Sequence, residues 1–243
     1  MRERCQTAHE GAADAQYVNV HGRRFYGRVQ RRKPQWRFLA LSPTAMHTTL
    51  SADIAHTAAR LVVQEGLEWG PAKRRALRQM GLPARTPLPD NDQVEAAVRE
   101  FIRLSCADTQ PRELRALRQL ALVWMERMAV FRPYLGGSVW YGTATRSSDI
   151  YLHLFCDDPK SAEIALIDHH VDYEPRTVPG FHRRSVEALS LSCPSPVLHE
   201  MVGVHLLIHD LDELRGALRP DTQGRPPRAD MAAVRRLLQE PMV

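Results

Sequence analysis

Residues 149–154 read Asp-Ile-Tyr-Leu-His-Leu, and ten residues separate them from the run Gly136-Gly137-Ser138. Within this stretch the odd-numbered side chains are polar and the even-numbered ones are aliphatic. Because successive side chains of a strand point to opposite faces, the alternation predicts a half-buried strand with one polar face. In the run before it, glycines allow close approach of the backbone to a ligand, and a serine can donate to a phosphate oxygen.

The segment Gly142–Asp149 reads Gly-Thr-Ala-Thr-Arg-Ser-Ser-Asp and joins the glycine-rich turn to the strand. Turn, segment and strand together resemble the polymerase-beta-like nucleotidyltransferase superfamily. There a Gly-Ser turn lies against the phosphates of a nucleotide, a Gly-x-(Ala/Thr)-x-x-x-Ser-Asp segment follows, and a strand presents two carboxylates at alternate positions. The resemblance covers about residues 111–215 and points to a divergent, poorly characterised bacterial branch with degenerate active-site carboxylates.

This resemblance implies a site for a nucleoside triphosphate. Gly137, Ser138, Thr145 and Ser148 match the nucleotide-binding positions of the family, and Asp149 matches a catalytic, metal-binding carboxylate. Nucleotidyl transfer relies on positioning and on divalent metals that neutralise developing charge. The implied cofactor is therefore Mg²⁺.

Two of the family's three acidic positions carry other residues in this chain. Tyr151 stands at the second position, and a phenol with a pKa of about 10 is a poor ligand for Mg²⁺. The third position falls on His205, within an apolar-x-apolar pattern, and Asp172 is the other candidate for it. The resemblance implies that His205 or His153 assists as a ligand or base, at a site that holds Mg²⁺ weakly.

Two functions follow from this altered pattern. In the first, the protein transfers a nucleotidyl group from a nucleoside triphosphate to an unknown acceptor. In the second, it keeps the fold as a catalytically degenerate module that senses a nucleotide or binds a protein partner. The missing carboxylates favour the second function, and the retained Gly-Ser turn and Asp149 favour the first.

Hydrophobic periodicity divides the rest of the chain into a helical part and a mixed part. The helical stretches are Ser51–Glu65, with Ser51 as N-cap, Pro71–Met80, a third opened by Asp90 or Asn91, and Pro111–Met128. After the first strand, a helix that Asp157 or Asp158 caps precedes strands at Val171–Val178, Val186–Cys193 and Val202–Ile208. Asp230 can cap a final helix.

The expected fold is therefore of the α/β (α+β) class, a helical N-terminal region followed by a small mixed-sheet, nucleotidyltransferase-like domain. Its expected divisions are a basic arm over residues 1–45, a helical region over 46–130, the nucleotidyltransferase-like domain over 131–218, and a loop and helix over 219–243.

Charge is concentrated in that arm. Residues 1–45 hold nine Lys and Arg against three Asp and Glu. Residues 46–243 hold the other 24 Lys and Arg and 25 Asp and Glu, so their charges nearly cancel. The arm is predicted to be disordered, and the composition points to nucleic-acid contact only there. A further alternative is DNA binding by the stretch 52–81, because its two predicted helices resemble the opening helices of TetR-like repressors.

The remaining patterns exclude several classes. Four scattered cysteines without a Cys-x-x-Cys pair predict reduced thiols, and no apolar run reaches the roughly 20 residues needed to span a bilayer. A cytoplasmic location without membrane contact is the resulting expectation. A zinc site at His205 and His209 with Asp210 or Asp212 is a rival metal hypothesis, although the β-rich sequence around it favours two histidines on one strand face.

Overall fold

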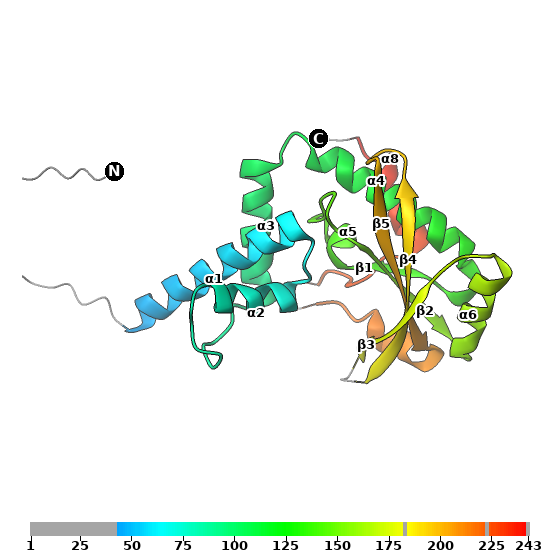
Figure 1. Ribbon diagram of the computed structural model, residues 1–243, viewed down its shortest axis with the longest axis horizontal. Coiled ribbons are helices and arrows are strands. Elements are labelled where there is room, and N and C mark those ends of the chain that lie inside the picture. The colour runs from blue at the N-terminus through cyan, green and yellow to red at the C-terminus, as the bar shows by residue number, and fades with distance from the viewer. Residues whose placement is uncertain (1–42, 182–183, 222–223, 242–243) are drawn as a thin grey trace, which may run out of the picture. The chain divides into compact units, whose positions relative to one another are not determined.

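The computed structural model describes residues 43–181, 184–221 and 224–241. Within this part it holds eight α-helices and one five-stranded sheet, which confirms the predicted mixed α/β class (Figure 1). No helix among the described residues is long and apolar enough to cross a membrane. The basic arm predicted for residues 1–45 lies, up to residue 42, outside the described residues.

Three helices build the first hydrophobic core: α1 (Pro43–Glu65), α2 (Trp69–Gln79) and α3 (Asn91–Ser105). α1 packs against both α2 and α3 through the apolar stripe that the sequence predicts. Asp90 caps α3 by accepting from the Gln93 amide, and Gly81, at φ +65°, follows the end of α2. The predicted N-cap at Ser51 is wrong, because α1 starts at Pro43 and the Ser51 hydroxyl donates to the side chain of Gln93.

The sheet has the order β1-β2-β5-β4-β3. Its strands are β1 (Tyr134–Gly136), β2 (Ile150–Cys156), β3 (Glu174–Pro179), β4 (Ser185–Ser195) and β5 (Glu200–Asp210). β2 and β5 pair in parallel, and every other pairing is antiparallel. The parallel pairing places Tyr151 of β2 directly beside His205 of β5.

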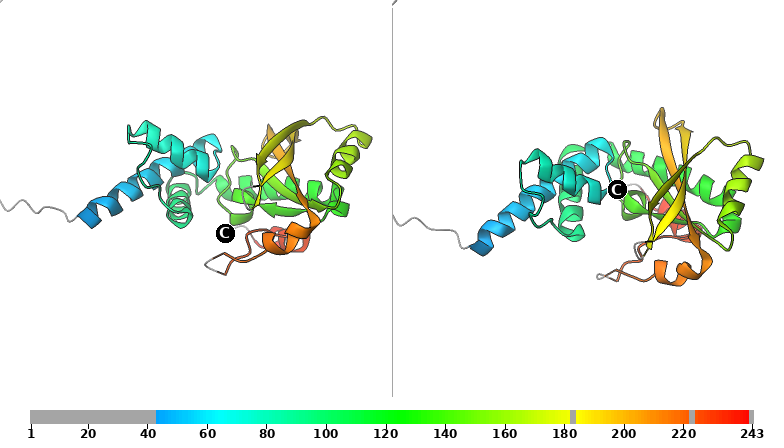
Figure 2. Two further views of the ribbon diagram at one scale, coloured as in Figure 1. Left: turned by 90° about the horizontal axis from the view of Figure 1, so that it is seen from below. Right: turned by 60° about the horizontal axis from the view of Figure 1, so that its bottom comes forward.

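Three helices cover one face of this sheet (Figures 1 and 2): α4 (Gln110–Arg127), α6 (Pro159–Asp168) and α8 (Met231–Gln239). The even-numbered residues of β2 and the even-numbered residues 202–208 of β5 are buried in this second core, as the alternation predicts. Asp158 caps α6 and Asp230 caps α8, both as expected. The odd-numbered side chains of β2 and β5, among them Tyr151, His153 and His205, are thereby left on the opposite side of the sheet.

The remaining short elements lie around the ends of the strands. α5 (Gly137–Tyr141) follows β1 directly, so the predicted Gly-Ser turn is the start of a short helix, with Gly137 at φ +68°. The 3₁₀ turns Ala129–Phe131 and Leu211–Glu213 and the helix α7 (Leu214–Ala217) complete the described elements.

The two cores lie within one compact unit, Leu41–Val243. Gly66, just after α1, lies against the loop before β2, and a Cβ atom there would meet the carbonyl oxygen of Ser147 at 1.9 Å. The Thr145 hydroxyl donates to the carbonyl of Val63 at 2.9 Å. These contacts fix the end of α1 next to the loop that carries Asp149.

Candidate functional site

A pocket of about 400 Å³ opens where the segment between α1 and α2 faces the start of α5. Gly137, Ser138 and Ser148 line it with backbone and hydroxyl groups. On another side lie the rings of Trp69 and Tyr141, which stack with their centroids 6.0 Å apart. The lining of the pocket therefore includes both small polar residues and two aromatic ones.

Asp149 lies directly before β2 and lines this pocket. Its side chain is 44% exposed, and it lies over Gly203 of β5. A Cβ atom at position 203 would lie 2.4 Å from Asp149 Oδ1, so a glycine is needed for the carboxylate to occupy this place. Sequence reasoning missed Gly203, although a glycine within a strand is a known signal of close approach by another group.

His205 joins Asp149 to a serine on the next strand. Its Nε2 lies 3.1 Å from Asp149 Oδ2, and its Nδ1 lies 2.9 Å from the hydroxyl oxygen of Ser190. The ring also stacks on Tyr151, with centroids 4.8 Å apart and planes 30° apart. The structure thus brings together Asp149 and His205, two of the predicted catalytic residues, and adds Ser190, which the sequence did not indicate.

Glu68 is a second carboxylate that sequence reasoning missed. It precedes α2, lines the first pocket, and has its Oε1 3.9 Å from the position of a Cβ atom on Gly137. Part of its side chain is exposed to solvent. Removal of water by the surrounding protein, and to a smaller extent the negative charge of Asp149, raise the pKa of Glu68. The two carboxylates therefore repel each other across the pocket, an arrangement that a cation would relieve.

Tyr151 remains a neutral phenol in this surrounding. Burial, followed by the charges of Glu68 and Asp149, raises the pKa of Tyr151 above its ordinary value. Its hydroxyl therefore carries no negative charge with which to bind a metal ion near neutral pH.

A second pocket, of about 470 Å³, lies over the polar face of the sheet and shares Glu68 and Gly137 with the first. Tyr151, Ser190 and His205 lie along it. Its other lining residues are Pro71, His153, Arg176, Val178, Pro179, Ala188 and Leu207. Asp149 lines the first pocket and His205 lines the second, so their hydrogen bond runs between a residue of one pocket and a residue of the other.

His153, the other predicted catalytic histidine, is buried at the edge of the second pocket. Its Nδ1 lies 2.9 Å from His209 Nε2, and the Phe181 ring stacks on His209 with centroids 4.2 Å apart. Burial, then the charges of Arg228 and His209, keeps the pKa of His153 well below its usual value. The structure therefore separates His153 from Asp149 and places it in a neutral, packed histidine pair.

The predicted nucleotide-binding residues fall into two groups. Gly137, Ser138 and Ser148 line the first pocket, and the Ser148 hydroxyl also accepts from the amide of Thr145 at 3.0 Å. Thr145 is 3% exposed, and its hydroxyl is occupied by the bond to Val63. Thr145 therefore shapes the loop and does not line the pocket.

The rival zinc set is not assembled. His205 bonds to Asp149 and Ser190, whereas His209 bonds to His153, farther along the same strand face. Among the described residues, no group of three or more His, Cys, Asp or Glu side chains is arranged to hold a metal ion. Asp149 and Glu68 remain as a pair of carboxylates at one pocket.

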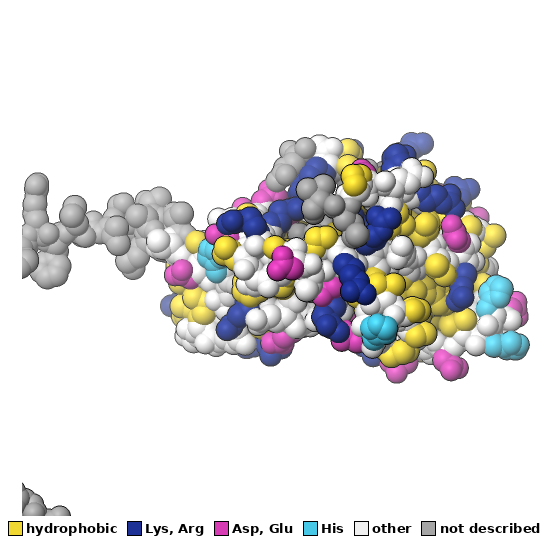
Figure 3. All heavy atoms as spheres, turned by 90° about the horizontal axis from the view of Figure 1, so that it is seen from above, with side chains coloured by type: hydrophobic (Ala, Val, Ile, Leu, Met, Phe, Trp, Pro, Cys, Tyr) yellow, Lys and Arg dark blue, Asp and Glu magenta, His cyan; other side chains and the backbone are white. Residues whose placement is uncertain are grey.

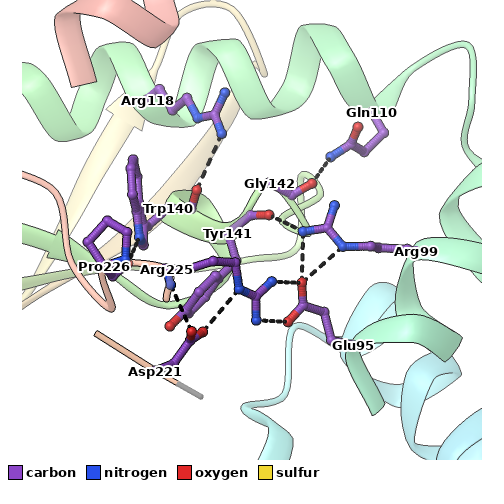
Figure 4. Close-up of polar contacts among 10 residues, drawn as sticks. All are labelled: Glu95, Arg99, Gln110, Arg118, Trp140, Tyr141, Gly142, Asp221, Arg225 and Pro226. Atoms are coloured by element: carbon purple, nitrogen blue, oxygen red, sulfur yellow. Dashed lines mark hydrogen bonds and ion pairs between the residues drawn. The ribbon is translucent and has the colours of Figure 1, made fainter. Parts of the chain in front are cut away.

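A network of charged groups holds Tyr141 at the first pocket (Figure 4). Glu95 of α3 accepts two hydrogen bonds from Arg225, at 2.8 and 3.1 Å, and further bonds from Arg99. Arg99 also donates to the Tyr141 carbonyl at 2.8 Å, and the Arg225 guanidinium lies 5.4 Å from the Tyr141 ring centroid. Burial opposes the charge on Glu95, but the hydrogen bonds from Arg225 and Arg99 outweigh it and lower the pKa of Glu95.

Basic residues show no single concentrated area on the face drawn in Figure 3, where hydrophobic and acidic side chains lie between the lysines and arginines. The start of α2, part of the stretch with the TetR-like pattern, contributes Glu68, Trp69 and Pro71 to the two pockets. DNA binding by residues 52–81 stays a prediction.

No protein-family model matches the chain, and no curated protein matches it. Solved structures that are similar to it include a cytoplasmic RNA terminal U-transferase, with 15% identity over 46% of this chain and 36% of that one, at a TM-score of 0.31. Others are Cid1 in complex with its short product ApU (18% identity, 44% and 32%, TM-score 0.29) and a mutant of the Cid1 poly(U) polymerase bound to MgATP (16%, 42% and 33%, TM-score 0.28).

The matched part of this chain spans about a third of the length of these structures. A likeness at this level of identity and TM-score carries no assignment of activity. Any function has to be argued from the groups that line the two pockets.

Proposed function

We propose that the protein is nucleotidyltransferase-like and binds a nucleoside triphosphate in the first pocket, from which a nucleotidyl group passes to an acceptor hydroxyl. The observation that carries this proposal is the position of Asp149. Asp149 lines the same pocket as Gly137 and Ser138. Its Oδ2 accepts a hydrogen bond from His205, which lines the second pocket. Groups that can bind phosphate, a carboxylate that can bind a metal ion and a candidate base are thus adjacent.

The first pocket suits the parts of a nucleotide. Gly137 can bring its backbone close to a phosphate, and Ser138 and Ser148 offer hydroxyl groups. Trp69 and Tyr141 offer flat rings for a nucleobase. Among the described residues that line this pocket there is no Lys or Arg, so a metal ion has to offset the charge of the triphosphate.

Asp149 and Glu68 are the residues that would hold Mg²⁺. Two carboxylates fit this ion, because Mg²⁺ in nucleotide sites is commonly bound by one or two carboxylates together with substrate phosphates and water. When bound, the ion would supply charge neutralisation at the phosphates. Because the site has two carboxylates and not three, Mg²⁺ alone and nucleotide alone should each bind weakly. Each should bind more tightly when the other is present.

His205 and Ser190 would handle the proton of the acceptor. As the acceptor oxygen forms its bond to the α-phosphorus, the bond to pyrophosphate breaks and pyrophosphate leaves with the electron pair. The acceptor proton passes to Nδ1 of His205, directly or through the Ser190 hydroxyl 2.9 Å away. Asp149, at Nε2, stabilises the resulting imidazolium.

Calorimetric titration of the full chain with ATP, GTP, CTP and UTP tests this proposal, with Mg²⁺ and with a chelator. We expect Mg²⁺-dependent binding of at least one nucleotide, and its loss in Asp149→Ala, because that change removes the ligand shared by metal and His205. The fold should persist, since the side chain is 44% exposed. Asp157→Ala, an exposed carboxylate just beyond β2, is the matched control. Equal affinity in Asp149→Ala and the control would refute the site.

A second candidate is a nucleotide sensor without catalysis, and one assay distinguishes it from the enzyme. The neutral phenol of Tyr151 at the second acidic position supports it. A sensor would bind the nucleotide with Mg²⁺ and release it unchanged, whereas the enzyme would form pyrophosphate once an acceptor is present. A pyrophosphate assay over an acceptor panel separates the two.

A further inference from the structure

The second pocket lies beside the first pocket, the proposed site of the nucleotide donor, and is lined by His205, the candidate base. We infer that this pocket binds the acceptor, and that the acceptor is a small, uncharged molecule with a hydroxyl on or beside a ring, not the end of a nucleic acid. The inference rests on the proposed function and adds the chemical class of the acceptor to it.

Position is the first argument. Ser190 and His205 form a directly opposed pair on β4 and β5, and both side chains line the second pocket. Asp149 contacts the same imidazole from the side of the first pocket. A hydroxyl group held in the second pocket would therefore lie next to His205, the proposed proton acceptor. The nucleotide would lie in the first pocket, which Asp149 lines.

The walls are the second argument. Pro71, Val178, Pro179, Ala188 and Leu207 give the pocket an apolar lining. At one side Tyr151 and His205 are stacked, with planes 30° apart. Flat aromatic and aliphatic surfaces of this kind bind the faces of rings, while a few convergent polar groups fix the orientation.

Charge is the third argument. A nucleic-acid strand is held by several cations along its phosphates. In this pocket the Arg176 guanidinium is paired with Glu174 at 2.8 Å, and its side chain is 62% exposed. His153 is buried and hydrogen bonded to His209, and Glu68 contributes a negative charge. The described residues that line this pocket therefore offer no series of cationic side chains for the successive phosphates of a nucleic-acid strand.

Size is the fourth argument. A volume of about 470 Å³ lies within the range of small-molecule sites, about 300–1,000 Å³, and accommodates one or two rings. A single-stranded chain would need a groove that continues for several nucleotides. The pocket thus has the dimensions of a site for one small acceptor.

The test uses the full chain, with phenyl β-D-glucoside as the uncharged probe and an oligouridylate with a free 3′ hydroxyl as the nucleic-acid probe. Binding of each probe is measured by calorimetry without nucleotide, and transfer is then measured from labelled nucleotides with Mg²⁺. We expect the glucoside to bind and to become labelled, and the oligouridylate to do neither. Binding or labelling of the oligouridylate with no response to the glucoside would overturn the inference.

Matched variants locate the probe. Val178→Trp, on the edge strand β3, fills the pocket and should weaken binding of the glucoside about tenfold or more. Thr177→Trp places the same ring on the neighbouring, exposed position of β3 and should leave binding unchanged. If Val178→Trp does not fold, as judged by circular dichroism, Leu207→Trp serves instead. Equal affinity in the pocket variant and the Thr177→Trp control would also overturn the inference.

Failure of the proposed function gives a different result. If the glucoside binds in the Val178-dependent way but no nucleotide binds with Mg²⁺, the pocket is supported and the donor site is refuted. If nucleotides bind with Mg²⁺ and the glucoside does not, the donor site stands and the assignment of the acceptor class fails.

Discussion

Asp149 depends on a neighbour that has no side chain. Gly203 leaves the space in which the carboxylate lies, and a Cβ atom there would come within 2.4 Å of Oδ1. We expect Gly203→Ala to displace the carboxylate and to weaken Mg²⁺-dependent nucleotide binding about tenfold, with the melting temperature changing little. Calorimetry on the cycle of Gly203→Ala, Asp149→Ala and the double variant checks the cause, because the alanine should have no further effect once Asp149 is gone.

Glu68 gives a second prediction at the scale of one residue. Glu68→Gln keeps the size of the side chain and removes its charge, so it should weaken Mg²⁺-dependent nucleotide binding about tenfold, or by about 1.4 kcal/mol. Stability should not fall, since repulsion with Asp149 is relieved. Glu100→Gln, an exposed position on α3, is the control. Unchanged nucleotide affinity in Glu68→Gln would leave Asp149 as the sole metal ligand.

The sequence indicated part of this site. Gly137, Ser138 and Asp149 were indicated by the resemblance of one continuous motif to a known family, and His205 by a short strand pattern that matched the same family. Glu68 lies far away in the chain, beside a helix start where an acidic residue commonly serves only the helix dipole. Ser190 had no motif at all and gained its place only through pairing of β4 with β5.

At the scale of elements, the Glu95 carboxylate links α3 to the segment before α8. Glu95→Ala removes the carboxylate that accepts from both Arg225 and Arg99, and leaves Arg225 only its ion pair with Asp221. It should lower the free energy of unfolding by about 2 kcal/mol. This figure is below the cost of breaking a fully buried pair, because the Arg225 side chain is 34% exposed. Urea unfolding measures it, and Glu100→Ala should change stability by less than about 0.5 kcal/mol.

Strands and caps were predictable because their signals are local. The alternation in β2, Asp90 before α3 and Asp230 before α8 are each read within a few residues. The strand order was not predictable, since the insertion of β5 between β2 and β4 depends on which apolar faces meet. The start of α1 at Pro43 was missed because Ser51 offered a plausible cap, whereas its hydroxyl bonds to Gln93.

The buried pair of His153 and His209 should make the stability of the folded chain depend on pH. Burial, with the charge of Arg228, lowers the pKa of His209 to about 4 from 6.5, so the unfolded chain takes up a proton between these values that the folded one does not. The free energy of unfolding should therefore fall as the pH decreases from about 6.5 to about 4, by up to about 3 kcal/mol for this residue. Above pH 6.5 the histidine contributes no slope.

Urea unfolding between pH 4 and 8 measures this dependence. His209→Phe retains a ring between Phe155 and Phe181 and should flatten the acid side of the curve. A wild-type slope that persists unchanged in this variant would assign the pH dependence to other groups.

The close approach of Gly66 to Ser147 has a consequence for the energetics of ligand binding. It means that the two hydrophobic cores meet at the loop of Asp149, while Glu68 and Trp69 reach the same pocket from the first core. A nucleotide held by residues of both cores would therefore stabilise α2 against local unfolding. Ligand should then slow amide hydrogen exchange throughout α2, at positions well away from any atom it touches.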